Sequence, residues 1–157
     1  MDRTDLEILR NFEQVWQRVQ KDKAGQTETN HQELEALMDG LADCWQSSRK
    51  LAYHTCGTQK IRLMRLSERI KKQYDCLQLH YFLKKGDIHF CKPMSDFASY
   101  TPYNLRKLWL STVKNEELLK KCILHENDEV IAGLEEMKTE FSDQKMEIEQ
   151  LIGELLQ

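Results

Sequence analysis

The sequence predicts an all-α protein built from long helices. Apolar residues recur at intervals of three and four along most of the chain, and this spacing places them on one face of an α-helix. The 157 residues include only two prolines and six glycines, and no stretch shows the strict alternation that is typical of a β-strand. The length fits one domain with a buried core.

The longest expected helix covers residues 58–87. Thr58 is a candidate N-cap at its start. At its end, Lys84 and Lys85 precede Gly86, as is typical of a helix C-terminus. One face of this helix carries the apolar residues Leu63, Leu66, Ile70, Tyr74, Leu77 and Tyr81.

The N-terminal segment is expected to form a unit of its own. Thr4 and Glu7 have the spacing of a capping box and precede an amphipathic helix over residues 5–21, which a polar linker follows. We therefore divide the chain into an N-terminal helix and linker at residues 1–30 and a helical bundle at residues 31–157. The apolar stripe of the first helix contains Leu9, Phe12, Val15, Trp16 and Val19.

Three further helices are expected within the bundle. The first has Asn30 as its N-cap and should stop at Gly57. The next has Thr101 as its N-cap and Pro102 at its first helical position, and it ends near His125. The last follows a short acidic break and continues to the C-terminus. Their apolar faces include Leu34, Leu37, Met38, Leu41, Trp45, Leu105, Leu108, Trp109, Leu119, Leu134, Met137, Phe141, Ile148 and Leu151.

The lengths of the connections predict the topology. Helices of about 25 residues span roughly 37 Å and suit a bundle of near-antiparallel helices. Short breaks near Gly57 and at residues 126–129 allow two helical hairpins, whereas the link at residues 88–100 is long enough to run along the bundle. We expect this crossover to be held to the bundle by its aromatic side chains; its alternative role is that of a ligand lid or partner surface.

Charge and cysteine content exclude several classes of partner. The formal net charge of −3 gives no overall positive field, so we expect no nucleic-acid partner, and the basic residues of the longest helix should pair with acidic neighbouring helices. No apolar run is long enough for a membrane span, and no signal peptide precedes the first helix. The odd number of scattered cysteines favours a reduced, cytoplasmic environment. These cysteines are Cys44, Cys56, Cys76, Cys91 and Cys122.

Several stretches resemble rubrerythrin-type ferritin-like proteins. The run LSERIKKQYDCLQLHYFLKKGD resembles the second bundle helix of that family, and DQKMEIEQLIGELL is similar to the same pattern. LADCWQSSRKLA and LWLSTVKNEELLKK are similar to the first and third bundle helices. The resemblance covers residues 31–157 and implies a ferritin-like four-helix bundle, preceded here by an extra helix. In the family, carboxylates and two Glu-x-x-His pairs hold two irons between the helices.

Carried over position by position, the resemblance implies that the di-iron ligands have been lost. Only Glu147 still offers a carboxylate, and two positions are aliphatic, whereas a di-iron centre needs several hard oxygen donors and imidazole. We therefore expect a non-catalytic bundle without iron, which acts as a protein-interaction or small-ligand module. The matching positions are Leu41, Ile70, Gln73, Thr112, Gln144 and Glu147.

The alternative is a rubrerythrin-like oxidoreductase or peroxidase that binds iron through displaced carboxylates. Several acidic residues lie near the expected ligand levels, although solvated helix faces explain them more simply. These residues are Asp39, Asp43, Glu68, Glu116, Glu117 and Asp143.

Two short His-x-Cys sequences and the first helix raise further possibilities. His54-Thr55-Cys56 and His89-Phe90-Cys91 offer imidazole and thiolate, which are zinc ligands. The expected fold separates them by about 35–40 Å, so a shared zinc site would need a second subunit, and isolated side chains at helix ends are the simpler interpretation. The apolar stripe of the first helix must be covered by the bundle or by another subunit, and we expect a dimer formed through this helix.

Overall fold

The structure, a computed structural model, describes residues 31–91, 99–124 and 128–157 together with isolated positions between residues 5 and 13. The expected N-terminal helix over residues 5–21 and the linker after it lie largely outside the described residues. The described part is all-α, as the sequence predicts. Its four helices are α2 (His31–Tyr53), α3 (Gly57–Lys85), α4 (Pro102–Leu124) and α5 (Asp128–Leu156).

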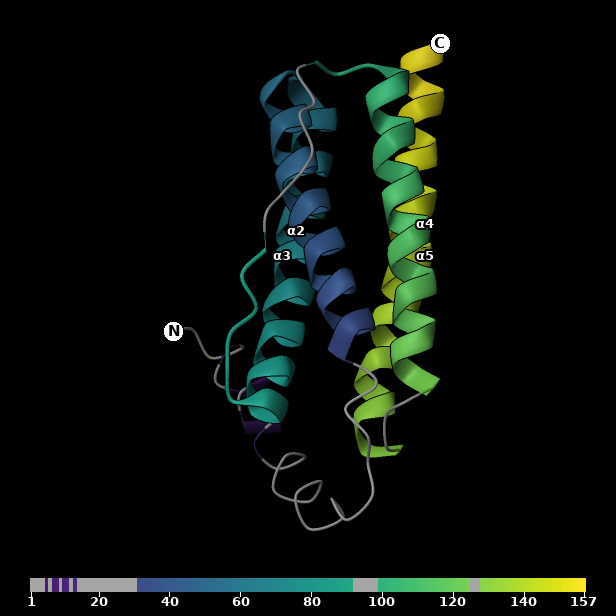
Figure 1. Cartoon of the computed structure of the whole chain (residues 1–157). Helices are drawn as coiled ribbons and strands as arrows, with labels where there is room; N and C mark the ends of the chain where they lie inside the picture. The colour runs from purple at the N-terminus through teal and green to yellow at the C-terminus, as the bar shows by residue number, and fades with distance from the viewer. Residues whose placement is uncertain are drawn as a thin grey trace.

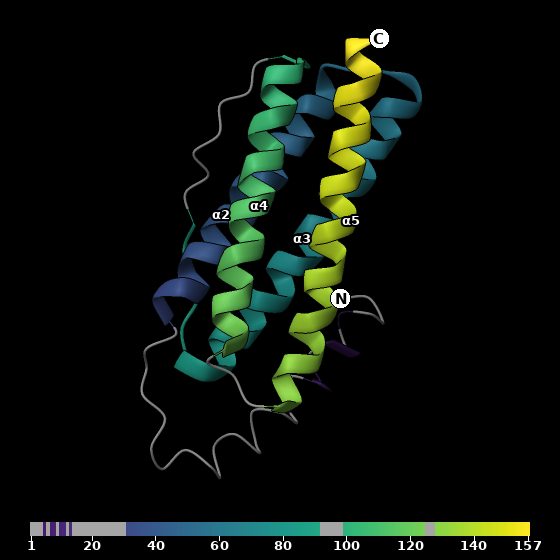
Figure 2. The same cartoon turned by 90° about the vertical axis from the view of Figure 1, so that its right-hand side faces the viewer.

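The four helices form a bundle in which α2 lies between α3 and α4 (Figure 1). It packs against α3 on one side and α4 on the other, α4 packs against α5, and α3 and α5 touch only slightly. In both views α2 and α5 run in one direction and α3 and α4 in the other (Figure 2). Because α3 ends at the end of the bundle opposite to the one where α4 begins, the connection between them has to span its length.

The helix ends follow local signals in most places. Gly86 caps α3 with a φ of 74°, and its N–H donates to the carbonyl of Phe82. At the start of α4, Thr101 Oγ1 accepts from the backbone N–H of Asn104 at 3.2 Å, which confirms the predicted cap.

The turn between α2 and α3 differs from the prediction. Helix α2 ends at Tyr53, before Gly57, and α3 begins at Gly57 with Cys56 in the N-cap position. The predicted N-cap, Thr58, therefore lies inside the helix. Gly57 has a φ of 67°, a conformation that glycine adopts without steric cost, so the chain turns at the glycine itself.

The predicted apolar faces meet in one core. Leu63, Leu77 and Phe141 are among its fully buried members, and Tyr74 is partly buried at its edge. Trp45 and Trp109 also lie at the margin of the core. Some buried polar groups form hydrogen bonds with each other. The hydroxyls of Ser48 and Ser67, for example, are 2.8 Å apart and join α2 to α3.

Charge pairs join the basic helix α3 to its acidic neighbours, as expected. Arg62 forms ion pairs with Glu147 and Glu154 of α5, and Lys85 lies 3.6 Å from Glu35 of α2. Because α3 and α5 make few other contacts, the Arg62 pairs are a main connection along that side of the bundle.

The two hairpins approach each other closely at Gly40 of α2. A Cβ atom at this position would lie 1.9 Å from the Oδ1 atom of Asn115 on α4. Asn115 is 2% exposed and its amide donates to Cys44 Sγ at 3.4 Å, so displacing it would disturb a buried contact. The absence of a side chain at Gly40 therefore determines how closely α2 and α4 pack.

We predict that Gly40→Ala destabilises the protein although alanine favours helices. The added methyl group overpacks the interface with Asn115, and the free energy of unfolding in urea should fall by about 1–3 kcal/mol. Gly153→Ala is the matched control because nothing lies within 4 Å of its added Cβ. It should stabilise the protein by about 0.5–1 kcal/mol. Equal effects of the two substitutions would show that the close approach carries no energetic constraint.

Candidate functional site

The six positions matched to di-iron ligands mostly lie inside the bundle. Leu41 and Ile70 belong to the apolar core. The buried Thr112 donates its hydroxyl proton to the carbonyl of Leu108 at 2.9 Å. Glu147, the single carboxylate of the set, accepts a hydrogen bond from Arg62 and is partly exposed. The acidic member is therefore engaged in an ion pair with α3.

The two glutamines of the set make the interior polar without making it acidic. Gln73 and Gln144 are 3% and 2% exposed. Gln73 donates to Glu140 at 2.7 Å, while its Oε1 and the Nε2 of Gln144 have no hydrogen-bond partner among the described residues. Neutral amides provide much weaker ligands for iron than carboxylates do.

The displaced carboxylates do not gather at one place. Glu68 lines a surface cleft, and Glu117 and Asp143 are exposed. The buried Glu116 accepts hydrogen bonds from Ser142 and from Lys145. Asp43 lies on α2, partly buried.

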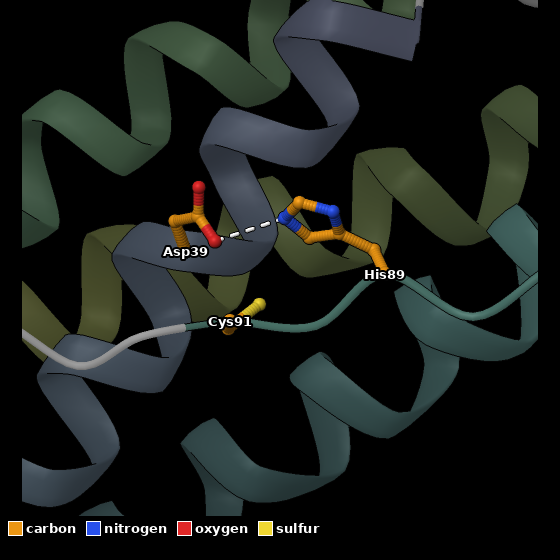
Figure 3. Close-up of side chains that lie close together, drawn as sticks. All are labelled: Asp39, His89 and Cys91. Carbon is orange, nitrogen blue, oxygen red and sulfur yellow. Dashed lines mark hydrogen bonds and ion pairs between the residues drawn. The ribbon is translucent and has the colours of Figure 1, made fainter.

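The remaining carboxylate, Asp39, lies in a cluster with His89 and Cys91 (Figure 3). In the described part of the chain, this is the one group of three or more side chains of metal-ligating type whose donor atoms converge, all within 4.8 Å of one another. Asp39 comes from α2, while His89 and Cys91 come from the segment that leaves α3. The Nε2 atom of His89 lies 2.9 Å from Asp39 Oδ1.

The backbone of His89 is held in place by Gln78 of α3. The Gln78 side chain donates to the carbonyl of His89 at 2.7 Å and accepts from its N–H at 3.1 Å. The ring of Tyr81 packs beside the imidazole, with 5.8 Å between the ring centres. The Tyr81 hydroxyl in turn donates to Glu35 of α2 at 2.7 Å. This imidazole is therefore positioned by both helices of the first hairpin.

Cys91 is a partly buried thiol with polar neighbours. Burial and a hydrogen bond to Asp39 together raise the pKa of the Cys91 thiol to about 12. A hydrogen bond with Tyr74 lowers this pKa by a smaller amount. A thiol with a raised pKa is a poor nucleophile. A nucleophilic cysteine needs a base that accepts its proton, whereas here the thiol bonds to Asp39 and the imidazole is also engaged with Asp39. The cluster therefore resembles a set of metal ligands more than a catalytic triad.

The second His-x-Cys sequence has different surroundings. His54 and Cys56 are both exposed in the turn between α2 and α3, and Cys56 is the N-cap residue of α3. His89 and Cys91 follow the other end of α3, so the helix separates the two sequences as predicted.

A surface cleft of about 640 Å³ lies along α2 and α3. Trp45 and Tyr53 of α2 and Met64 of α3 provide its apolar surface, and Asp5 of the N-terminal segment is also among the lining residues. The guanidinium carbon of Arg49 lies 5.0 Å from the centre of the Trp45 ring. The cleft combines an aromatic surface with basic side chains.

Comparisons of the chain with protein-family models, with curated proteins and with solved structures give no significant match. The all-α four-helix architecture is therefore supported by the structure alone. The ferritin-like assignment is supported by the resemblance of sequence patterns described above. None of the described helices is long and apolar enough to cross a membrane.

We predict that Glu116 makes the stability of the bundle sensitive to acid. Burial opposes its ionisation, but hydrogen bonds from Lys145 and Ser142 and the nearby charge of Lys120 outweigh this effect, so its pKa lies below the usual value. A lowered pKa stabilises the fold above the usual carboxyl pKa of about 4.3, and this contribution is lost as the pH falls through the folded-state pKa.

Glu116→Gln should therefore lower the free energy of unfolding by about 1–2 kcal/mol at pH 7, and the difference from wild type should shrink as the pH falls below about 4. Glu117→Gln, an exposed neighbour, is the control and should change stability by less than about 0.5 kcal/mol. Urea unfolding monitored by circular dichroism at several pH values measures both. A difference for Glu116→Gln that does not vary with pH would contradict the assignment.

Proposed function

We propose that this chain is a non-catalytic ferritin-like bundle that has lost the di-iron site and acts as a protein-interaction module. The observation that carries the proposal is the set of residues at the six matched positions. Five of them are neutral and buried, and the one carboxylate, Glu147, is paired with Arg62. A pair of irons would need several carboxylates at this place.

The α2–α3 cleft is the surface on which we place the partner. Seven of its twelve lining residues are charged, and Trp45, Tyr53 and Met64 add apolar surface; this mixture suits the apolar face and polar flanks of an amphipathic helix of a protein partner. Among the lining residues that belong to α2 and α3, four are basic and two are acidic. An amphipathic helix with acidic residues beside its apolar face fits such a groove.

The N-terminal stretch of the chain is a candidate for such an amphipathic helix. Its predicted helix at residues 5–21 has an apolar stripe flanked by charged residues of both signs, with Asp5, Glu7 and Glu13 as the acidic ones. Asp5 already lies among the lining residues of the cleft. We propose that exchange of this stretch between two copies of the chain, each docked in the cleft of the other, forms a dimer.

The first prediction of this proposal concerns iron. After anaerobic loading with ferrous iron and desalting, elemental mass spectrometry should find fewer than two irons per chain. Cys91→Ser should remove any single ion held by the cluster of Asp39, His89 and Cys91. Iron that this variant still retains would therefore lie in the bundle interior. About two irons per chain in both proteins would instead support the rubrerythrin-like oxidoreductase, and peroxidase assays would follow.

The second prediction concerns the dimer. Met64 lines the cleft and is 49% exposed, so Met64→Glu should leave the bundle folded. It should weaken the dimer at least tenfold, because docking of the apolar helix face would remove the new charge from water. Met146→Glu is the matched control, since Met146 is 58% exposed on α5 and does not line the cleft. Sedimentation of the full chain over a range of concentrations measures the effect. A wild-type chain that stays monomeric would rule out self-association.

A further inference from the structure

The cluster of Asp39, His89 and Cys91 has the composition of a transition-metal site. A thiol, an imidazole and a carboxylate converge, with every donor atom within 4.8 Å of the others. Ligands of a tetrahedral zinc ion lie about 3.3–3.8 Å apart, given bonds of about 2.0–2.3 Å. Side-chain adjustments of about 1 Å therefore bring the three donors to coordination distance.

Local backbone geometry explains why two of the donors point the same way. His89 and Cys91 lie two residues apart in a segment without helical structure. In an extended chain, residues two apart project from the same side. Figure 3 shows both side chains turned toward Asp39 on the neighbouring helix α2.

The site is held in place by residues that are not ligands. Gln78 fixes the backbone of His89 through two hydrogen bonds, and its Nε2 atom lies 3.1 Å from the hydroxyl of Tyr74. Tyr81 packs against the imidazole ring. Supporting contacts of this kind orient metal ligands and reduce the entropy lost on binding.

We propose that Asp39, His89 and Cys91 bind one Zn²⁺ ion, which joins the segment leaving α3 to helix α2. The sulfur and nitrogen donors select zinc over magnesium and calcium, which prefer oxygen ligands. Three protein ligands leave a fourth position for water. The side chains of Asp39 and His89 are 50% and 18% exposed, so the ion can reach the site from solvent.

Binding exchanges a proton for the metal ion. The Cys91 thiol is protonated in the metal-free protein, because burial and its hydrogen bond to Asp39 raise its pKa to about 12. When Zn²⁺ binds, the S–H bond breaks, a zinc–sulfur bond forms and the proton passes to solvent. The positive charge of the ion then compensates the thiolate and the Asp39 carboxylate together.

The test uses the full-length, untagged chain and Zn²⁺ in competition with a chromogenic chelator. We expect one Zn²⁺ per chain, and at least tenfold weaker binding in Cys91→Ser, His89→Ala and Asp39→Asn. The second His-x-Cys sequence provides a matched control within the same protein. His54→Ala and Cys56→Ser should bind Zn²⁺ as the wild type does, because these two residues are exposed and outside the cluster.

A second measurement separates loss of a ligand from loss of folding. Substitution of Co²⁺ for Zn²⁺ should give thiolate-to-cobalt charge-transfer absorption in the wild type and in Cys56→Ser, and none in Cys91→Ser, while all three keep the same helical circular dichroism. The proposal is overturned if the wild type binds no Zn²⁺, if Cys91→Ser binds it with wild-type affinity, or if the charge-transfer band depends on Cys56.

Discussion

The architecture depends on the close approach of α2 and α4 at Gly40. Helices α2 and α4 make most of the contact between the two hairpins, whereas α3 and α5 barely touch. A side chain at Gly40 would collide with the buried amide of Asn115, so the distance between the hairpins follows from its absence. Helix α2 also carries Asp39 and part of the lining of the cleft.

Much of the fold could be predicted because its signals are local. Apolar spacing identified the buried faces, and the caps at Thr101 and Gly86 need only neighbouring residues for their effect. The turn at Gly57 was placed less well. Thr58 has a side chain typical of an N-cap, yet the chain turns where the glycine takes a positive φ, and α3 begins there. Where two turn signals are adjacent, local sequence alone does not tell which of them the chain uses.

The surface cluster could be predicted only in part. The His-x-Cys sequence contains two of its donors, and residues two apart in an extended segment face the same side. The third donor, Asp39, lies 50 positions away from His89 and was grouped with carboxylates expected near the bundle interior. Its place in the cluster depends on how α2 lies against the segment after α3. Gln78 holds that segment to α3 through hydrogen bonds to the backbone of His89.

Two thiols of this protein show that surroundings, more than acidity, decide what a cysteine can do. Burial raises the pKa of Cys44 and of Cys91 to about 12. Cys44 is fully buried beside Asn115 and Thr112, which offer a cation neither charge nor access. Cys91 is partly exposed and has a carboxylate and an imidazole within reach. An incoming cation can therefore replace the proton of Cys91, whereas the proton of Cys44 stays in place and the thiol serves the packing of α2 against α4.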